Sequence, residues 1–253
     1  MTSGTSQPNA PQNVYDEGTF FDGYRELRRA DSGLNGALEV PALRRLLPDL
    51  RGRRILDMGC GFGDFARYAR ASGAEAVVAI DVSRRMLEEA RRLTDDAAIG
   101  FRRCAIEDFS IQGEAFDLVV SSLALHYVAD YPAVVGRVFE ALKPGGLFVF
   151  SVEHPICTAH PVGWVRDTDG TRLHWPVDGY RNEGRRDTRW FIDGVVKYHR
   201  TIETYVGALI AHGFRIEGLF EPEPTAESLA RRPDLDAERR RPPFLILSAS
   251  RPA

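Results

Sequence analysis

Residues 55–69 read ILDMGCGFGDFARYA, an apolar run followed by three glycines within five positions. The apolar run predicts a buried strand, and the segment after the glycines has the pattern of a helix. Glycine at a strand-to-helix turn allows a positive φ and lets a ligand approach the backbone, because no Cβ is in the way. Ligands of open parallel sheets bind beyond the carboxyl ends of the strands. We therefore predict a small-molecule site at Gly59, Gly61 and Gly63.

Predicted strands and helices alternate along the rest of the chain. We expect strands in residues 53–59, 76–83, 100–108, 146–153, 214–224 and 242–250, and a further strand from residue 116. Helices are expected in residues 64–73, 83–96, 131–146 and 201–214, and residues 15–50 also have a helical pattern. A charged loop is expected at residues 225–241. Such alternation is typical of the α/β class, with a doubly wound, mainly parallel sheet.

Residues 154–200 interrupt this alternation and are rich in aromatic residues, His and Arg. We predict that they form a cap inserted into the domain. Within the cap, WFIDGVVKYHRT predicts a β-hairpin with its turn at Asp193-Gly194. The expected organisation is a disordered tail at residues 1–13, rich in Ser, Thr, Pro and Asn, followed by one domain at residues 14–253.

Composition limits the partners and the compartment. The formal net charge of −3 gives no reason to expect a nucleic-acid partner. The three cysteines have no close pairing, which favours a reducing compartment. We see no signal-peptide pattern and no long apolar stretch, so the sequence predicts a cytoplasmic protein, monomeric or homodimeric, without a membrane partner.

The spacing of the glycine loop narrows the choice of ligand. Nicotinamide dinucleotides bind to G-x-G-x-x-G, whereas this loop reads G-C-G-F-G. Asp57 precedes the loop, where a carboxylate would repel a pyrophosphate and favour an ammonium group. Asp81 ends the next strand, where a carboxylate can accept both hydroxyls of a ribose.

Four motifs in this order, DMGCGFGD, AIDVS, FDLVVSSLALHYV and LKPGGLFVFS, resemble the class I S-adenosylmethionine-dependent methyltransferases of the small-molecule, type 11-like group. The resemblance covers residues 15–151 well and the final helix and two strands in outline. It implies a Rossmann-like sheet of seven strands in the order 3-2-1-4-5-7-6, with an N-terminal helical lid. The implied cofactor is S-adenosylmethionine, and its product is S-adenosylhomocysteine.

The resemblance also implies which residues bind the cofactor. Those at the methionine part and the ribose are Asp57, Gly59, Gly61 and Asp81, with Cys60 packing in the loop. Those at the adenine are Val82, Met86, Ala105, Ile106 and Glu107, and Ser121 and Leu123 would lie beside the sulfonium. Ala105-Ile106 stand where the family usually has Asp-Ala, so their backbone groups or Glu107 must replace the usual side-chain bond to the adenine amine.

Tyr24 and Arg28 lie in the segment that resembles the family's helical lid. They are four residues apart and therefore share one face of a helix. Arg28 would pair with the methionine carboxylate of the cofactor. The alternative is a core tyrosine beside a solvated arginine.

Methyl transfer from a sulfonium is an in-line displacement that needs alignment and, for many acceptors, removal of a proton. Candidate bases should follow the fourth and fifth strands or lie in the cap. Glu153 and His154 end the fifth strand, His199 ends the predicted hairpin, and His126 follows the fourth strand. We expect His154 or His199 to be the base, whereas His126 can instead be a helix-start or lid residue. No metal site is predicted, because the H-x₂-C-x₂-H spacing from His154 is cramped and lacks a fourth ligand.

The cap should determine the acceptor. Its candidate substrate-binding residues are Trp164, Tyr180, Arg186, Trp190 and Tyr198. Aromatic side chains can line a pocket for a planar or apolar molecule, and arginine can bind a carboxylate or phosphate. The alternative is that the aromatic residues form a small core of the cap and the arginines a solvated face.

The sequence therefore predicts transfer of a methyl group from S-adenosylmethionine to O, N or activated C of a small molecule, such as a natural product of secondary metabolism or a metabolic intermediate. One alternative is a methyltransferase that acts on RNA or protein. Another is an S-adenosylmethionine-binding cyclase or isomerase that transfers no methyl group, since this fold does not dictate one reaction.

Overall fold

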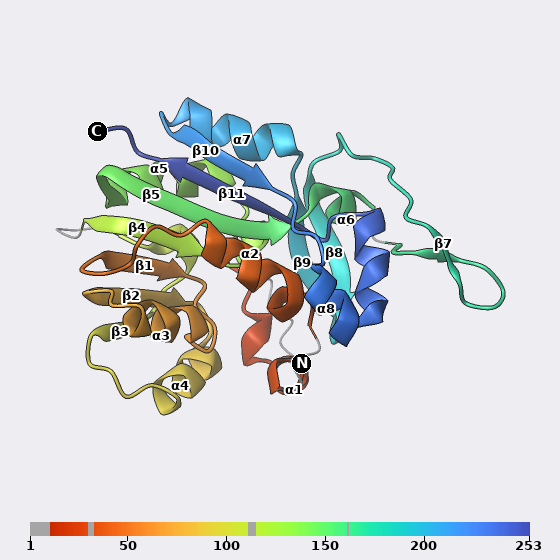
Figure 1. Ribbon diagram of the computed structural model, residues 1–253, viewed down its shortest axis with the longest axis horizontal. Helices are drawn as coiled ribbons and strands as arrows, with labels where there is room; N and C mark the ends of the chain where they lie inside the picture. Colours follow the sequence, from red (N-terminus) through yellow and green to blue (C-terminus); the bar gives the residue numbers. More distant parts are fainter. Residues whose placement is uncertain (1–10, 30–32, 111–114, 161) are drawn as a thin grey trace, which may run out of the picture.

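A seven-stranded sheet forms the centre of the computed structural model, which describes residues 11–29, 33–110, 115–160 and 162–253 (Figure 1). Its strands are β1 (Arg54–Met58), β2 (Ala76–Asp81), β3 (Ile99–Arg103), β4 (Phe116–Ser121), β5 (Leu142–Glu153), β10 (Arg215–Phe220) and β11 (Phe244–Ser250). Their order is β3-β2-β1-β4-β5-β11-β10, which confirms the predicted 3-2-1-4-5-7-6. Strands β1 to β5 pair in parallel, and β11 is antiparallel to both β5 and β10.

Helices cover both faces of this sheet. On one face, α5 (Tyr131–Ala141) and α7 (Ile202–Ala211) bury Tyr131 and Tyr205 in the larger hydrophobic cluster. On the other face, α2 (Val40–Arg45), α3 (Asp64–Ala71) and α4 (Arg84–Arg92) bury Leu43, Ala66 and Leu87. The strands between them are apolar on both sides, as expected of a covered parallel sheet.

Helix termini coincide with the capping residues of the sequence. Ser83 Oγ accepts a hydrogen bond from Met86 N at the start of α4, at 3.1 Å. Thr201 Oγ1 accepts one from Thr204 N at the start of α7, also at 3.1 Å. Each bond satisfies an amide that has no partner within its own helix. The predicted N-cap at Ser83 and helix start at Thr201 are therefore confirmed.

The N-terminal elements extend from the β2–α4 edge to the segment before α7. They are η1 (Val14–Asp16), α1 (Gly18–Arg29) and η2 (Asn35–Glu39), a π-helical turn that leads directly into α2. Asp16 Oδ1 accepts hydrogen bonds from Ser83 Oγ and Arg85 N, at 2.6 and 3.0 Å. At the other side, Gln12 Oε1 accepts from Val196 N at 2.9 Å.

Between β5 and α7 lie α6 (Pro155–Ala159) and two two-stranded sheets, β6 (Val165–Arg166) with β7 (Arg172–His174) and β8 (Gly184–Trp190) with β9 (Ile192–His199). The predicted hairpin exists, but the predicted turn position is wrong. Trp190 pairs with Ile192, so the chain reverses at Phe191, which has a φ of 60°. Asp193 and Gly194 lie within β9, where the positive φ of Gly194 accommodates a register irregularity. The domain boundaries proposed from the sequence stay a prediction.

Residues 225–241, predicted as a charged loop, form α8 (Ala226–Arg231) and the 3₁₀ segment η5 (Pro233–Arg240). Thr225 caps α8 by accepting from Ser228 N at 3.1 Å. Leu235 is buried, and Glu238 pairs with Arg241 at 3.0 Å, so an apolar anchor and an ion pair order the segment. Among the described residues, no helix has the length and apolarity that crossing a membrane requires.

Candidate active site

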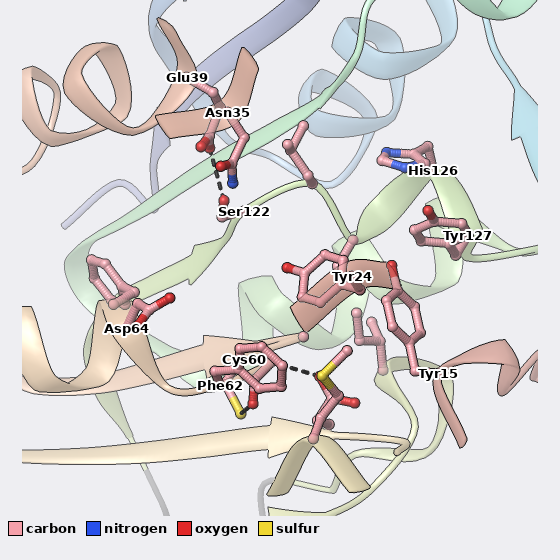
Figure 2. A pocket seen from close by; sticks show the side chains of 18 of the residues that line it. Tyr15, Tyr24, Asn35, Glu39, Cys60, Phe62, Asp64, Ser122, His126 and Tyr127 are labelled. Carbon is pink, nitrogen blue, oxygen red and sulfur yellow. Dashed lines mark hydrogen bonds between the residues drawn. The ribbon is translucent and has the colours of Figure 1, made fainter. Parts of the chain in front are cut away.

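A cavity of about 580 Å³ lies at the carboxyl ends of the central strands, beneath the N-terminal elements. Its size is in the range of small-molecule sites. Figure 2 shows Glu39, Asn35 and Ser122 on one side, His126, Tyr127 and Tyr15 on the other, and Tyr24 between them. The cavity is lined by the glycine loop, by the ends of β2, β4 and β5, and by Trp190 from the hairpin. It is also lined by η2 and by two 3₁₀ turns, η3 (Ile106–Asp108) and η4 (Leu125–Tyr127).

The glycine loop provides a backbone surface that side chains would block. Gly59 has a φ of 76°, and a Cβ there would lie 2.4 Å from the Cβ of Ala124. Gly61 has a φ of 52°, and a Cβ there would meet nothing within 4 Å. The loop is held to β2, because Gly59 N and Cys60 N both donate to Ile80 O, at 2.9 and 3.0 Å. Gly61 therefore presents its backbone to open space in the cavity.

Two buried carboxyl groups face the same space. Burial, with the charges of Asp81 and Asp64, raises the pKa of Asp57 to about 8, and its Oδ2 has no hydrogen-bond partner among the described residues. Burial also raises the pKa of Asp81, to about 6, although its carboxylate accepts from Gly61 N and Ser83 N, both at 2.9 Å. A cation at Asp57 and hydroxyl donors at Asp81 would offset the cost of burying these charges.

Most residues predicted to bind the cofactor line the cavity. Beside Asp57, Gly59, Gly61 and Asp81, these are Tyr24, Arg28, Cys60, Val82, Met86, Ala105, Ile106 and Glu107. Ser121 is fully buried and lies outside the lining, because its Oγ donates to Met58 O at 2.9 Å and so joins β4 to β1. Leu123, which follows β4, does line the cavity and has a φ of 52°.

Arg28 is held at the wall of the cavity by polar partners. Its guanidinium donates to Asn35 Oδ1 at 2.8 Å and forms an ion pair with Asp64. Both Asn35 and Asp64 also line the cavity. Arg28, in the last turn of α1, therefore joins α1 to η2 and to the start of α3, next to the glycine loop.

Of the four predicted catalytic residues, Glu153 and His126 line the cavity. Burial alone would raise the pKa of Glu153, but Lys197 and His126 hold it below its usual value; Lys197 Nζ lies 2.5 Å from its Oε1. Burial lowers the pKa of His126 to about 4, so the ring is neutral at pH 7. Its Nδ1 accepts from Glu153 N at 3.4 Å, which leaves the proton of the neutral ring on Nε2.

The other two predicted bases, His154 and His199, lie outside the cavity lining. His154 is the N-cap of α6, where its Nδ1 accepts from Ile156 N at 3.1 Å and its Nε2 lies 2.8 Å from Glu221. His199 contacts Thr158 Oγ1 through Nδ1 at 2.7 Å and Tyr180 O through Nε2 at 2.9 Å. Both ring nitrogens of each histidine therefore have polar partners.

Among the predicted substrate-binding residues, Trp190 lines the cavity. Trp164 lies in a second cavity of about 310 Å³, where it packs edge to face against Trp175. The Tyr180 hydroxyl oxygen accepts a hydrogen bond from Ile202 N at 3.1 Å, and Arg186 donates to backbone carbonyls of its own segment. Tyr198 lies 5.6 Å from the guanidinium of Arg200. The structure thus brings one of the five to the cavity.

Several residues of the site are not predicted by the sequence motifs. Glu39, Asp64, Tyr15 and Tyr127 line the cavity, and Lys197 reaches Glu153 from β9. A signal existed for Glu39, which stands among Leu and Val residues in NGALEVPAL. Lys197 is one of two lysines in an arginine-rich chain. Among the described residues, no group of three His, Cys, Asp or Glu is placed to hold a metal ion.

Comparisons with known proteins agree with this geometry. Residues 56–150 match the family model described as a methyltransferase domain. An S-adenosylmethionine-dependent methyltransferase from Mesorhizobium loti is 48% identical, with a TM-score of 0.81, over 87% of this chain and 100% of that chain. A candidate enzyme of the same kind from Listeria monocytogenes is 42% identical, with a TM-score of 0.78, over 85% and 98%.

A malonyl-[acyl-carrier protein] O-methyltransferase from Enterobacter lignolyticus is 40% identical over 110 residues, which are 44% of this chain and 43% of that protein. This match spans less than half of either chain. The two longer matches, together with the family model, show that the chain belongs to the S-adenosylmethionine-dependent methyltransferases. Its cofactor is S-adenosylmethionine, as the resemblance of the four sequence motifs implied.

The residues present fit this cofactor. S-adenosylmethionine carries an α-ammonium group, an α-carboxylate and two ribose hydroxyls. Asp57 offers a buried oxygen that has no partner in the part of the chain that the structure describes. Gly61 offers an open backbone, and Asp81 offers a carboxylate at the end of β2. When bound, the cofactor supplies a methyl group activated by positive charge on sulfur.

Proposed function

We propose that this methyltransferase acts on a small planar or apolar molecule, bound at the aromatic end of the cavity. Support comes from the rings that meet there edge to face: Tyr15 lies 5.6 Å from Tyr24 and 6.1 Å from Tyr127, and Tyr24 lies 6.0 Å from Trp190. Such rings provide large apolar area at a low entropic cost. The observation that carries the proposal is that one cavity includes both Asp57 with Asp81 and these rings with Glu153.

Glu153 is the group that receives the acceptor's proton in this proposal. It ends β5, lines the cavity, and has a pKa held below its usual value, so it is ionised at neutral pH. Lys197 fixes its position through the 2.5 Å ion pair. A positioned carboxylate beside a bound acceptor satisfies the geometric requirement for a general base.

His126 orients the acceptor in the same proposal. Its ring is neutral, its Nδ1 accepts from Glu153 N, and its Nε2 therefore donates. A donor beside a carboxylate suits an acceptor that carries a hydroxyl or amine. His154 and His199 are assigned structural roles. The ring of His154 joins the start of α6 to Glu221, which follows β10, and the ring of His199 joins Thr158 of α6 to Tyr180.

The acceptor cannot be carried over from the Enterobacter enzyme. That protein's name records methylation of oxygen on a malonyl-[acyl-carrier protein], but the match covers 44% of this chain. Trp190 and Lys197 belong to β8 and β9, in the segment between β5 and α7 that the methyltransferase family model does not cover. In this proposal the choice of acceptor therefore depends on residues outside the region that the family model covers.

A product-based experiment tests the proposal. Enzyme and methyl-labelled S-adenosylmethionine are incubated separately with small-molecule, RNA and protein fractions of the host cell. We expect label in the small-molecule fraction, with one equivalent of S-adenosylhomocysteine for each methyl group transferred. Label found only in RNA or protein would contradict a small-molecule acceptor, and a new product without S-adenosylhomocysteine would indicate a cyclase or isomerase.

A further inference from the structure

Glu39 is a fully buried glutamate that the proposed methyl transfer does not use. It ends the π-helical turn η2 and is the N-cap of α2, above the ends of β4 and β5. Burying a carboxylate costs free energy unless partners satisfy it. π-Helical turns are rare and are often found at functional sites. The position of Glu39 at the cavity therefore requires a physical reason.

One oxygen of Glu39 is satisfied and the other is not. Oε1 accepts from Ser122 Oγ at 2.9 Å (Figure 2). It also accepts from Ser151 Oγ at 2.5 Å. Oε2 is buried and has no hydrogen-bond partner among the described residues. The two serines come from the ends of β4 and β5, so the sheet fixes the direction of the carboxylate. Burial raises the pKa of Glu39, and a bound cation would oppose that shift.

The neighbours of Glu39 carry the opposite charge. Arg28 lies at the same wall and bonds to Asn35, which belongs to the same π-helical turn as Glu39. The positive charges of Arg28 and Arg44 favour the ionised form of the Glu39 carboxyl and so oppose the rise in its pKa that burial causes. The guanidinium of Arg44 stacks on the Tyr68 ring, 4.0 Å from its centroid. This wall of the cavity therefore combines a buried carboxylate with a guanidinium. An α-amino acid presents the complementary pair, an ammonium and a carboxylate.

We propose that Glu39 binds the α-ammonium group of the methionine part of S-adenosylmethionine, while Arg28 faces its carboxylate. An ammonium has three donors, and Glu39 Oε2 is a buried acceptor at the cavity without a partner among the described residues. Glu39 is thus a binding residue that selects the amino-acid end of the cofactor. The proposal depends on the cofactor alone and not on the identity of the acceptor.

Calorimetric titration with two ligands tests this role. S-adenosylhomocysteine carries the amino acid, whereas 5′-methylthioadenosine has the same nucleoside without it. For Glu39→Gln we expect S-adenosylhomocysteine affinity to fall about 10- to 100-fold, as for loss of a charge-assisted hydrogen bond, with 5′-methylthioadenosine affinity unchanged. Glutamine keeps an oxygen for the two serines, so the fold should persist, which circular dichroism verifies. Glu107→Gln is the matched control, another acid of the cavity lining, and should not discriminate between the two ligands.

A second titration remains decisive if Glu39→Gln does not fold. The unaltered protein should bind an S-adenosylhomocysteine analogue without the α-amino group about 10-fold or more weakly than S-adenosylhomocysteine. In a folded Glu39→Gln protein that difference should become smaller, because one carboxylate partner of the amino group has gone and Asp57 remains. Three results would each overturn the proposal. In Glu39→Gln they are an equal loss of affinity for S-adenosylhomocysteine and 5′-methylthioadenosine, or no loss of affinity for either. In the unaltered protein it is equal affinity for S-adenosylhomocysteine and for the analogue without the α-amino group.

Discussion

At the scale of single residues, the site contains three carboxyl groups whose burial costs free energy of folding. Asp57, Asp81 and Glu39 all have a raised pKa because burial disfavours their charged form. Two of them keep an oxygen without a partner among the described residues. Such groups weaken the free protein and gain stabilisation when a cationic or hydroxyl-bearing ligand binds.

Asp57→Asn should stabilise the ligand-free protein and impair cofactor binding. The folded pKa of about 8 exceeds the unfolded value of about 3.9, so raising the pH from about 4 to 8 ionises the unfolded chain first and lowers stability. Asparagine removes this penalty. We expect the free energy of unfolding in urea at pH 8 to rise by about 1–3 kcal/mol, with a smaller gain at pH 5. Equal gains at both pH values would contradict the raised pKa.

Glu153→Gln should lower turnover by about 100-fold, since it removes the proton acceptor together with its ion pair to Lys197. The affinity for S-adenosylhomocysteine should stay unchanged, because the residues assigned to the cofactor remain in place. His154→Asn is the comparison variant, because asparagine can still cap α6. It should keep turnover within a few-fold of the unaltered enzyme. The reverse result, in which His154→Asn abolishes turnover and Glu153→Gln does not, would restore His154 as the base.

At the scale of elements, two segments distant in sequence meet above the cavity. Phe20 of α1 packs edge to face on Trp190 and Phe191, with ring centroids 5.3 and 5.5 Å apart. A Cβ on Gly23 would lie 2.7 Å from the Phe191 ring, so α1 approaches the hairpin through a glycine. Access to the cavity therefore depends on contact between α1 and the β8–β9 hairpin.

Gly23→Val should separate these two elements, because the larger side chain cannot fit against Phe191. We expect faster amide hydrogen exchange in α1 and in β8–β9, with the exchange of β1 and β4 unchanged. Gly207→Ala is the control, since a Cβ there meets nothing within 4 Å. Unchanged exchange in α1 for Gly23→Val would show that the contact does not hold the elements together.

The sequence predicts well those helices and strands whose formation depends on residues close to them in the chain. Ser83 and Thr201 cap helices through bonds to residues three positions away, and the strands follow from apolar runs. Phe191 was missed as the turn because its conformation depends on pairing across the hairpin and packing on α1. Likewise, Asp57 and Asp81 were found from the loop beside them, whereas Glu39 meets Ser151 from 112 positions away, which no local pattern records.

At the scale of the whole molecule, the strand order creates the site. The chain crosses from β3 back to β4 beside β1, so the carboxyl ends of β1 and β4 open a crevice between oppositely directed crossovers. The glycine loop leaves β1 on one side of that crevice, and Ser122 with Leu123 leaves β4 on the other. The strand order therefore forms the cofactor site, whereas the N-terminal elements and the β8–β9 hairpin form the aromatic end of the cavity.

Binding at this crevice should stabilise the entire domain. S-adenosylhomocysteine at 100 times its Kd should raise the free energy of unfolding by about 2.7 kcal/mol, which thermal unfolding reports as a higher Tm. Asp81→Asn should lose most of this shift, because the ribose partner has been weakened. NADH should give no shift, and a shift with NADH as large as that with S-adenosylhomocysteine would contradict the ligand assignment.

The most direct test of the account is a crystal structure of the protein with S-adenosylhomocysteine. We predict the ribose hydroxyls at Asp81, the amino-acid part between the glycine loop and Glu39, and the sulfur directed towards Tyr24 and Glu153. Electron density for the ligand outside this cavity, or with the amino-acid part directed towards Glu107, would contradict it.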